Sequence, residues 1–358
     1  MTQPISREEA FRNKINVISI LCAVLVVYLH SFSFNDGPRN SFAYHLEFFI
    51  SRNIAQAAVP AFFAMSGFLF YRNFDLSQLF RKWKSRFHSL VIPYLLWNGI
   101  SMVIFFVISR FSFISMEPFA LNLENIFHGL VFYRYNLIFW FVFQLILLTY
   151  LCPVLYGLLK NRVVAVCLFG VLLTLYGLDI REIWFIEVRA VIYYGFGAYF
   201  ALHHQQWLIS REKVSIFGIG AFLVAQVMIY TGLDERNIVY ILDRILLAVA
   251  VFDFSNLLTT VKVPRFLQCS FPIYAMHNLI LEFFNKVFSF ALSPESNWIL
   301  LDYFLSPILT IAIIALLNAF LLKYTPKVHG NLFGGRVRRP MIEYGPPDFR
   351  RAISTIFR

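Results

Sequence analysis

Long apolar runs separated by short polar and basic stretches dominate the chain from residue 15 to residue 323. A helix that spans a membrane needs about 20 mostly apolar residues, and ten segments meet this length. They lie near residues 15–33, 53–71, 89–109, 136–158, 163–179, 183–203, 214–232, 237–258, 266–290 and 298–322. The connections are short, and no soluble domain fits between the segments. The pattern therefore predicts an all-α integral membrane protein, a bundle of about ten transmembrane helices.

Composition and charge support a chain that lies in a bilayer. Hydrophobic residues make up 59% of the 358 positions and charged residues only 14%, whereas soluble domains have about 45–50% and about 25%. If the N-terminus is inside, the cytoplasmic stretches carry 22 of the 31 Lys and Arg residues, in agreement with the positive-inside rule. Both termini are therefore predicted to be cytoplasmic. The membrane topology then explains the net charge of +11, so this charge does not indicate a nucleic acid as a partner.

This topology divides the chain into three parts. Residues 1–14 form a cytoplasmic N-terminal segment, residues 15–323 the membrane domain, and residues 324–358 a basic cytoplasmic tail that is expected to lie against anionic lipid. The first apolar run has no small-x-small cleavage site after it and is expected to remain as a span. The four cysteines stand alone in or beside apolar segments, so neither a disulfide framework nor a metal site is predicted.

A histidine, His30, closes the first apolar run, where hydrocarbon gives way to lipid headgroups. Its ring could be an idle side chain at the interface with water. It could also be a general base, because an imidazole with an ordinary pKa near 6.5 can take a proton from an alcohol near neutral pH. The residue type alone leaves both interpretations open.

Two further segments carry polar landmarks. In the second span, Ser66-Gly67 offers a hydroxyl and lets a neighbouring backbone approach closely. The run RKWKSRFH at residues 81–88 forms a basic collar before the third span. The collar fits the positive-inside rule and lipid phosphates, and equally well a phosphate site for a nucleotide-bearing donor.

Six landmarks follow one another along the chain. They are His30 at the end of span one and the segments VPAFFAMSGFLFY, KSRFHSLVIPYLLW, LIFWFVFQLILLTYLCPVLY, VIYYGFGAYF and SFPIYAMHNLI. In this order and near this spacing, they resemble the acyltransferase 3 family of membrane O-acyltransferases, over roughly residues 11–323. The resemblance implies transfer of an acyl group, usually acetyl, from cytoplasmic acyl-coenzyme A to a hydroxyl of a cell-surface or extracytoplasmic sugar.

The resemblance also implies roles for particular residues. His30 takes the position of the family's catalytic histidine, and Lys84 and Arg86 correspond to its basic donor-side run. His277 corresponds to a second family histidine, although Asn278 stands where a proline often follows. Acyl-coenzyme A, with acetyl-coenzyme A favoured, is a donor substrate, so no permanently bound cofactor is expected.

One departure from the family pattern concerns Ser19, which stands where the family commonly has Arg or Lys, eleven residues before the catalytic histidine. The missing cation would have lain about 16 Å from His30 on the same helix face. Arg12 or Arg189 is expected to replace it at the donor. Glu187 and Arg189 are two residues apart and on a helix cannot face each other, so each is expected to face another helix or a watery cavity.

The sequence therefore predicts a multi-pass enzyme of the cell membrane, the cytoplasmic membrane in a bacterium, that O-acetylates a polysaccharide or its lipid-linked precursor. His30 acts as a general base or carries the acyl group covalently, and Ser66, His277 and Glu187 are further active-site candidates. Its partners are acyl-coenzyme A, a saccharide and the bilayer, and the oligomeric state is open. A transporter or flippase for a glycan intermediate is the principal alternative, because intramembrane charges suit a polar pathway. A non-catalytic partner of a glycan synthase is another.

Overall fold

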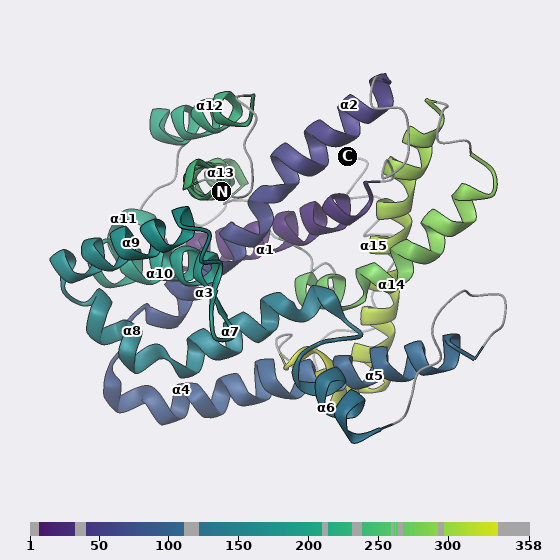
Figure 1. Cartoon of the computed structure of the whole chain (residues 1–358), viewed down its shortest axis with the longest axis horizontal. Helices are drawn as coiled ribbons and strands as arrows, with labels where there is room; N and C mark the ends of the chain where they lie inside the picture. The colour runs from purple at the N-terminus through teal and green to yellow at the C-terminus, as the bar shows by residue number, and fades with distance from the viewer. Residues whose placement is uncertain are drawn as a thin grey trace, which may run out of the picture.

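The computed structural model of the chain is almost entirely helical (Figure 1). It describes residues 7–32, 41–110, 122–209, 214–230, 238–258, 261, 263, 268–292 and 297–335. Residues 1–6 of the predicted N-terminal segment and residues 336–358 of the predicted tail lie outside the described residues.

The helices follow the apolar segments of the sequence. They are α1 (Arg7–His30), α2 (Phe42–Phe48), α3 (Ala58–Tyr71), α4 (Leu79–Arg86), α5 (Ile92–Ile108), α6 (Leu123–Val131), α7 (Trp140–Tyr150), α8 (Cys152–Leu159), α9 (Arg162–Gly177), α10 (Val188–His203), α11 (Gln205–Ile209), α12 (Ile216–Tyr230), α13 (Ile238–Phe254), α14 (Ser270–Ser289), α15 (Ile299–Tyr324) and α16 (Pro326–Phe333). A small antiparallel hairpin, β1 (Glu182–Ile183) and β2 (Ile186–Glu187), precedes α10. Asparagine and serine side chains begin several helices, as Asn161 does for α9 by accepting two backbone N–H groups.

Four continuous helical stretches of the described chain are long and apolar enough to cross a bilayer. They are Arg7–His30, Phe42–Tyr71, Leu76–Ile108 and Ile299–Tyr324. A fifth is added if Leu137–Tyr150 and Cys152–Leu159, which meet at 69°, count as one bent span. The all-α membrane architecture is thereby supported, while the predicted count of ten spans and the cytoplasmic placement of both termini stay predictions.

Two of the predicted segments have a different local structure. The basic collar is continuous with the third span, because a π-helical turn, Phe87–Val91, joins α4 to α5 within one 33-residue helical stretch. The segment predicted at 136–158 bends at Pro153, in the first turn of α8. Proline has no backbone N–H, so it cannot donate a hydrogen bond to the preceding turn. The axis of α8 therefore departs from that of α7 near this residue.

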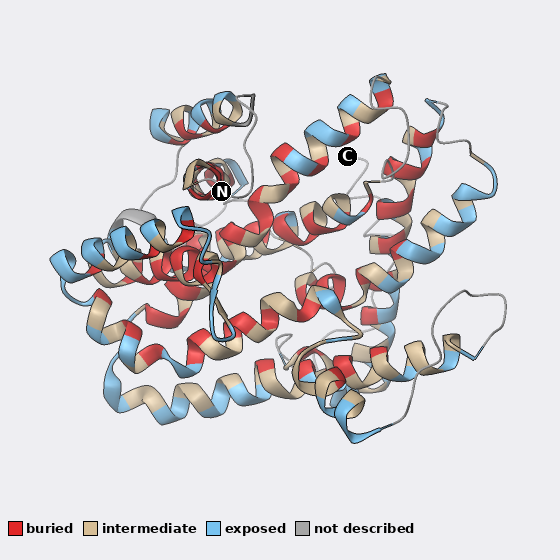
Figure 2. Cartoon of the chain, in the orientation of Figure 1, coloured by how far each residue is buried: buried red, intermediate tan, exposed pale blue. Residues whose placement is uncertain are grey.

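Among the described helices, α3 and α10 make the most extensive contact, and Figure 2 shows a concentration of buried residues there. A Cβ atom on Gly67 would lie 2.1 Å from the carbonyl oxygen of Tyr194, and one on Gly197 would lie 1.8 Å from that of Ala64. The predicted close approach of a backbone at Ser66-Gly67 is therefore confirmed, and its partner is α10. Small residues allow such contact between membrane helices.

The outer surface is strongly apolar. Large aliphatic side chains are exposed along several helices, among them Val103, Val166, Val227 and Leu316. Soluble monomers rarely expose contiguous apolar patches of this kind, so these side chains are expected to meet lipid tails.

The beginning of the predicted tail folds back on the bundle. Helix α16 follows α15 after one residue, and its Phe333 is only 1% exposed. The indole nitrogen of Trp97 donates to the carbonyl oxygen of Leu332 at 3.0 Å, and the His329 ring is 2.9 Å from Asn318 Oδ1. Burial lowers the pKa of His329. This part of the tail is therefore held by protein contacts, and its contact with lipid stays a prediction.

Candidate active site

His30 ends α1 and lines a cavity of about 220 Å³ to which α1, α3, α7, α10, α13 and α14 contribute side chains. His30 is exposed at the end of the helix and contributes to the lining of this cavity. The polar residues that share the lining are Gln56, Arg189, Tyr193, Tyr240 and Arg244. The hydroxyl of Tyr193 is buried and has no hydrogen-bond partner among the described residues. His30 is thus placed at a small cavity between helices whose lining is part polar and part apolar.

His277 lies directly beside His30, with 5.2 Å between the two ring centroids. Its Nδ1 is 2.8 Å from the carbonyl oxygen of Tyr274 and 3.2 Å from that of Ile273. A carbonyl oxygen can only accept, so Nδ1 carries the proton and a neutral ring keeps a lone pair on Nε2. That Nε2 is buried and has no hydrogen-bond partner in the described part of the chain. The structure therefore brings the two predicted histidines together.

Arg189 lines the same cavity as His30 and forms an ion pair with Glu187. The expectation that these two residues cannot face each other was wrong. It assumed that both lie inside a helix, whereas Glu187 belongs to β2 and stands before the first turn of α10 in an extended conformation. The guanidinium of Arg189 also lies 4.7 Å from the ring of Trp140. These contacts fix the arginine at the His30 end of the bundle.

Arg244 is the second arginine of this cavity and is buried. Its intramembrane charge was its only signal in the sequence. Arg244 is 5% exposed, and its guanidinium nitrogen Nη1 is 3.3 Å from the carboxylate of Asp243. The same nitrogen, Nη1, approaches the carbonyl oxygen of Asn53 at 3.5 Å, and Nη2 approaches that of Arg52 at 3.4 Å. Three other lining residues carried no signal in the sequence, because uncharged polar residues are common in helices and only the fold brings them to one cavity. They are Gln56, Tyr193 and Tyr240.

A second cavity, of about 280 Å³, lies farther toward the N-terminal end of α1. Its lining includes Ser19, Ser66 and Arg86, so the position of the missing family cation and one arginine of the basic collar share one space. Lys84 is exposed and outside this lining. Arg12 is also exposed and lines neither this cavity nor that of His30. Of the four predicted donor-side residues, Arg86 is the one that reaches the second cavity.

Three aromatic residues line both the His30 cavity and the Arg86 cavity. They are Phe62 of α3, Phe141 of α7 and Tyr274 of α14. The ring centroids are 5.9 Å apart for Phe62 and Phe141 and 5.7 Å apart for Phe141 and Tyr274. The hydroxyl of Tyr274 donates to the carbonyl oxygen of Ile138. We call these three rings the aromatic partition, because they form the wall that the two cavities have in common.

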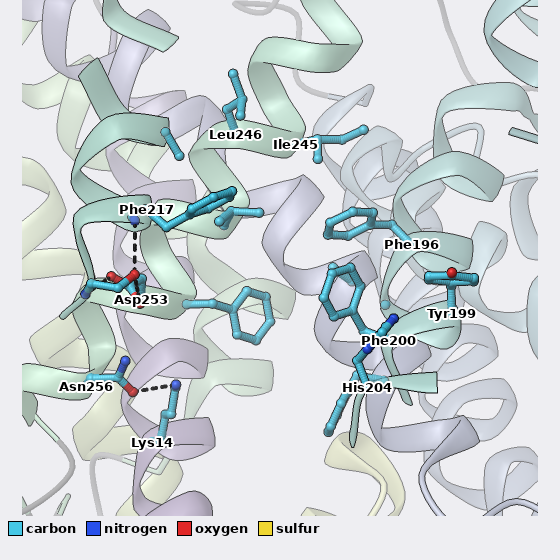
Figure 3. A pocket seen from close by; sticks show the side chains of 18 residues that line it. Lys14, Phe196, Tyr199, Phe200, His204, Phe217, Ile245, Leu246, Asp253 and Asn256 are labelled. Carbon is cyan, nitrogen blue, oxygen red and sulfur yellow. Dashed lines mark hydrogen bonds between the residues drawn. The ribbon is translucent and has the colours of Figure 1, made fainter. Parts of the chain in front are cut away.

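A larger and mainly apolar cavity, of about 540 Å³, lies between α10, α12 and α13 (Figure 3). Phe196 and Phe200 stand on one side of it and Phe217 on the other. Lys14 donates to Asn256. None of the predicted site residues lines this cavity. In the described ranges, no group of three or more His, Cys, Asp or Glu side chains is arranged to hold a metal ion.

Comparison with known proteins identifies a family for this chain. A family model described as an acyltransferase domain matches residues 12–320, which is most of the chain. No curated protein and no solved structure matches. The matched region contains most of α1, all of α2 to α14, both histidines and the cavities of His30 and Arg86. The chain therefore belongs to the acyltransferase 3 family and is a membrane acyltransferase.

Proposed function

We propose that this membrane acyltransferase moves an acetyl group from acetyl-coenzyme A to a hydroxyl of a cell-surface polysaccharide or its lipid-linked precursor. The observation that supports the proposal best is the place of His30. It shares a cavity with two arginines, and the aromatic partition lies between that cavity and a second one that contains Arg86. A histidine that merely lies at the interface with water would need neither the two arginines nor the second cavity.

The Arg86 cavity is the proposed donor side. Arginine binds phosphate oxygens with two parallel hydrogen bonds, so Arg86 at this cavity suits the phosphates of coenzyme A. Because Arg86 lines the same cavity as Ser19, it also supplies a cation near the position where the family carries one on the first span. Arg189, which was expected as a substitute for that cation, lies instead beside His30 and is proposed to act there.

In the proposed reaction, a ring nitrogen of His30 takes the proton from the acceptor hydroxyl as its oxygen attacks the thioester carbonyl. The carbon–sulfur bond breaks, and the protonated His30 returns its proton to the thiolate of coenzyme A. Arg189, Arg244 and the Tyr193 hydroxyl can stabilise the charge on the carbonyl oxygen in the tetrahedral intermediate. Covalent transfer through an acyl-His30 intermediate uses the same groups and is the alternative route.

His277 is proposed as a positioning residue. Its Nδ1–H is fixed by backbone carbonyl oxygens, so the lone pair on Nε2 is available to the His30 ring. Once His30 gains a proton, an N–H on its ring can donate toward this lone pair. The pair of rings would then be more stable at the moment when His30 is charged.

In the predicted topology, the two cavities lie toward opposite sides of the membrane. With ten spans and both termini cytoplasmic, the Arg86 cavity lies on the donor's side, and His30 lies toward the acceptor. In sealed inverted vesicles acetyl-coenzyme A added outside should be used, whereas right-side-out vesicles should use it only after permeabilisation. The reverse pattern would refute this placement.

Radiolabelled acetyl-coenzyme A added to membranes tests the function directly. Wild-type membranes should place label on saccharide, and His30→Ala membranes should not. His45→Ala is the matched control, because His45 is an exposed histidine on α2 that lines none of the three cavities. Transfer that persists in His30→Ala would rule out the mechanism, and no transfer by any form would favour transport or a scaffolding role.

A further inference from the structure

We propose that the aromatic partition of Phe62, Phe141 and Tyr274 determines which acyl groups this enzyme transfers, by admitting short chains from the Arg86 cavity to His30 and excluding long ones. This inference rests on the proposed function, because it requires an acyl donor in the Arg86 cavity.

The partition lies on the path between the proposed donor site and His30. Ser19 and His30 are eleven residues apart on α1, which corresponds to about 16 Å along the helix. A donor held by Arg86 must extend its thioester over this distance to meet His30. Among the described residues, the linings of the two cavities share only the three rings of the partition. The acyl group therefore has to pass them.

The rings come from three helices and are held from several sides. Phe141 is 4.5 Å from Phe63, centroid to centroid, in an edge arrangement. Tyr274 is 7% exposed, is 5.5 Å from the ring of Phe139 and donates its hydroxyl to a backbone carbonyl. Aromatic side chains have few rotatable bonds, so rings held in this way make a stiff wall. A stiff wall discriminates by size better than flexible side chains do.

The space beyond the partition is also small. The His30 cavity has about 220 Å³, which is less than the roughly 300–1,000 Å³ of pockets that hold drug-sized ligands. That space must receive both the acyl group and the acceptor hydroxyl. A two-carbon acyl group leaves room for the hydroxyl, and a long chain would fill the cavity or remain on the far side of the rings.

The test compares acetyl-, butyryl- and octanoyl-coenzyme A as donors for the same saccharide acceptor. For wild type we expect transfer of acetyl and at least about tenfold less transfer of octanoyl, since a single misfitting methylene already costs about 10–200-fold in a fitted pocket. Phe62→Ala and Phe141→Ala should raise the octanoyl-to-acetyl ratio by at least about tenfold. Phe196→Ala is the matched control, because Phe196 lines the apolar cavity of Figure 3 and not the partition.

The ratio of two donors is an internal measure, so partial loss of folded protein does not change it. If an alanine variant loses all transfer, Phe62→Leu and Phe141→Leu, which open the wall less, take its place. Unchanged ratios in variants that still transfer acetyl would overturn the inference and leave the proposed function standing. A wild-type protein that transfers no acyl group would overturn both.

Discussion

The contact between α3 and α10 can be opened with a single methyl group. Gly197→Ala would place a Cβ 1.8 Å from the carbonyl oxygen of Ala64, whereas real Cβ atoms essentially never come closer than 3.0 Å to such an atom. The neighbour is rigid backbone on α3, so the two helices must separate. Overpacking of this kind lowers the stability of the folded protein by about 1–3 kcal/mol. The higher helix propensity of alanine, compared with glycine, offsets up to about 1 kcal/mol of this loss.

Separating α3 from α10 also displaces residues of the proposed active site. Helix α3 carries Phe62 of the partition, and α10 carries Arg189 of the His30 cavity. A misplacement of about 1 Å in a reacting geometry can cost about 100-fold in rate. We therefore expect Gly197→Ala to lower acetyl transfer by roughly one to two orders of magnitude. The same variant should have a lower Tm, measured by heating and size-exclusion chromatography in detergent.

Gly170→Ala in α9 provides the control, because a Cβ there meets no atom within 4 Å. It should retain wild-type transfer and the wild-type Tm or a slightly higher one. If Gly197→Ala matched Gly170→Ala in both measurements, the helices would not be held at the distance described. The inference that this helix contact positions Phe62 and Arg189 at the His30 cavity would then be refuted as well.

Three further predictions concern the donor, the histidine pair and the tail. Arg86→Gln should raise KM for acetyl-coenzyme A about tenfold or more, because a hydrogen bond to a charged group is worth about 1.5–3 kcal/mol. Lys84→Gln should leave this KM nearly unchanged. Both values are measured from initial rates at increasing donor concentration. His277→Leu should lower kcat about tenfold with little change in KM, because the protonated His30 loses an acceptor, while His277→Gln, which keeps an acceptor, should restore part of the kcat. Burial lowers the pKa of His329 in the folded protein, so the unfolded chain binds the proton more readily. The Tm should therefore fall as the pH drops below about 6.5. In His329→Gln the Tm should depend less on pH over this range.

Each of these has an outcome that contradicts it. Equal KM changes in Arg86→Gln and Lys84→Gln would mean that the collar acts only as a diffuse positive surface. Equal kcat in His277→Leu and His277→Gln would remove the lone pair on Nε2 from the mechanism. For His329 the Tm is compared between about pH 5 and about pH 7.5, a range that brackets the ordinary histidine pKa. The same profile in wild type and His329→Gln would show that His329 does not control the docking of α16.

Much of the architecture could be predicted because the bilayer restricts the choices. Without water to satisfy backbone N–H and C=O groups, an apolar run must form a helix, so the apolar segments indicated where most helices lie. Chain order and the polar landmarks then indicated the family, which the match over residues 12–320 confirmed. The local errors have local causes. The predicted span at 183–203 begins with a hairpin at Glu182 to Glu187, where short apolar runs give no distinction between strand and helix.

The sequence by itself determined that the chain is a helical membrane acyltransferase, and it predicted His30 and His277 as active-site residues. It could do so because hydrophobic length and linear motifs are properties of the chain alone. The tertiary structure decided which side chains share a space. It placed Arg86 in a cavity and left Lys84 outside, paired Arg189 with Glu187, and brought three rings from α3, α7 and α14 between the two cavities. Residues far apart in the sequence meet only through the way helices pack, and apolar helices of similar composition give no one-dimensional signal of which face meets which neighbour.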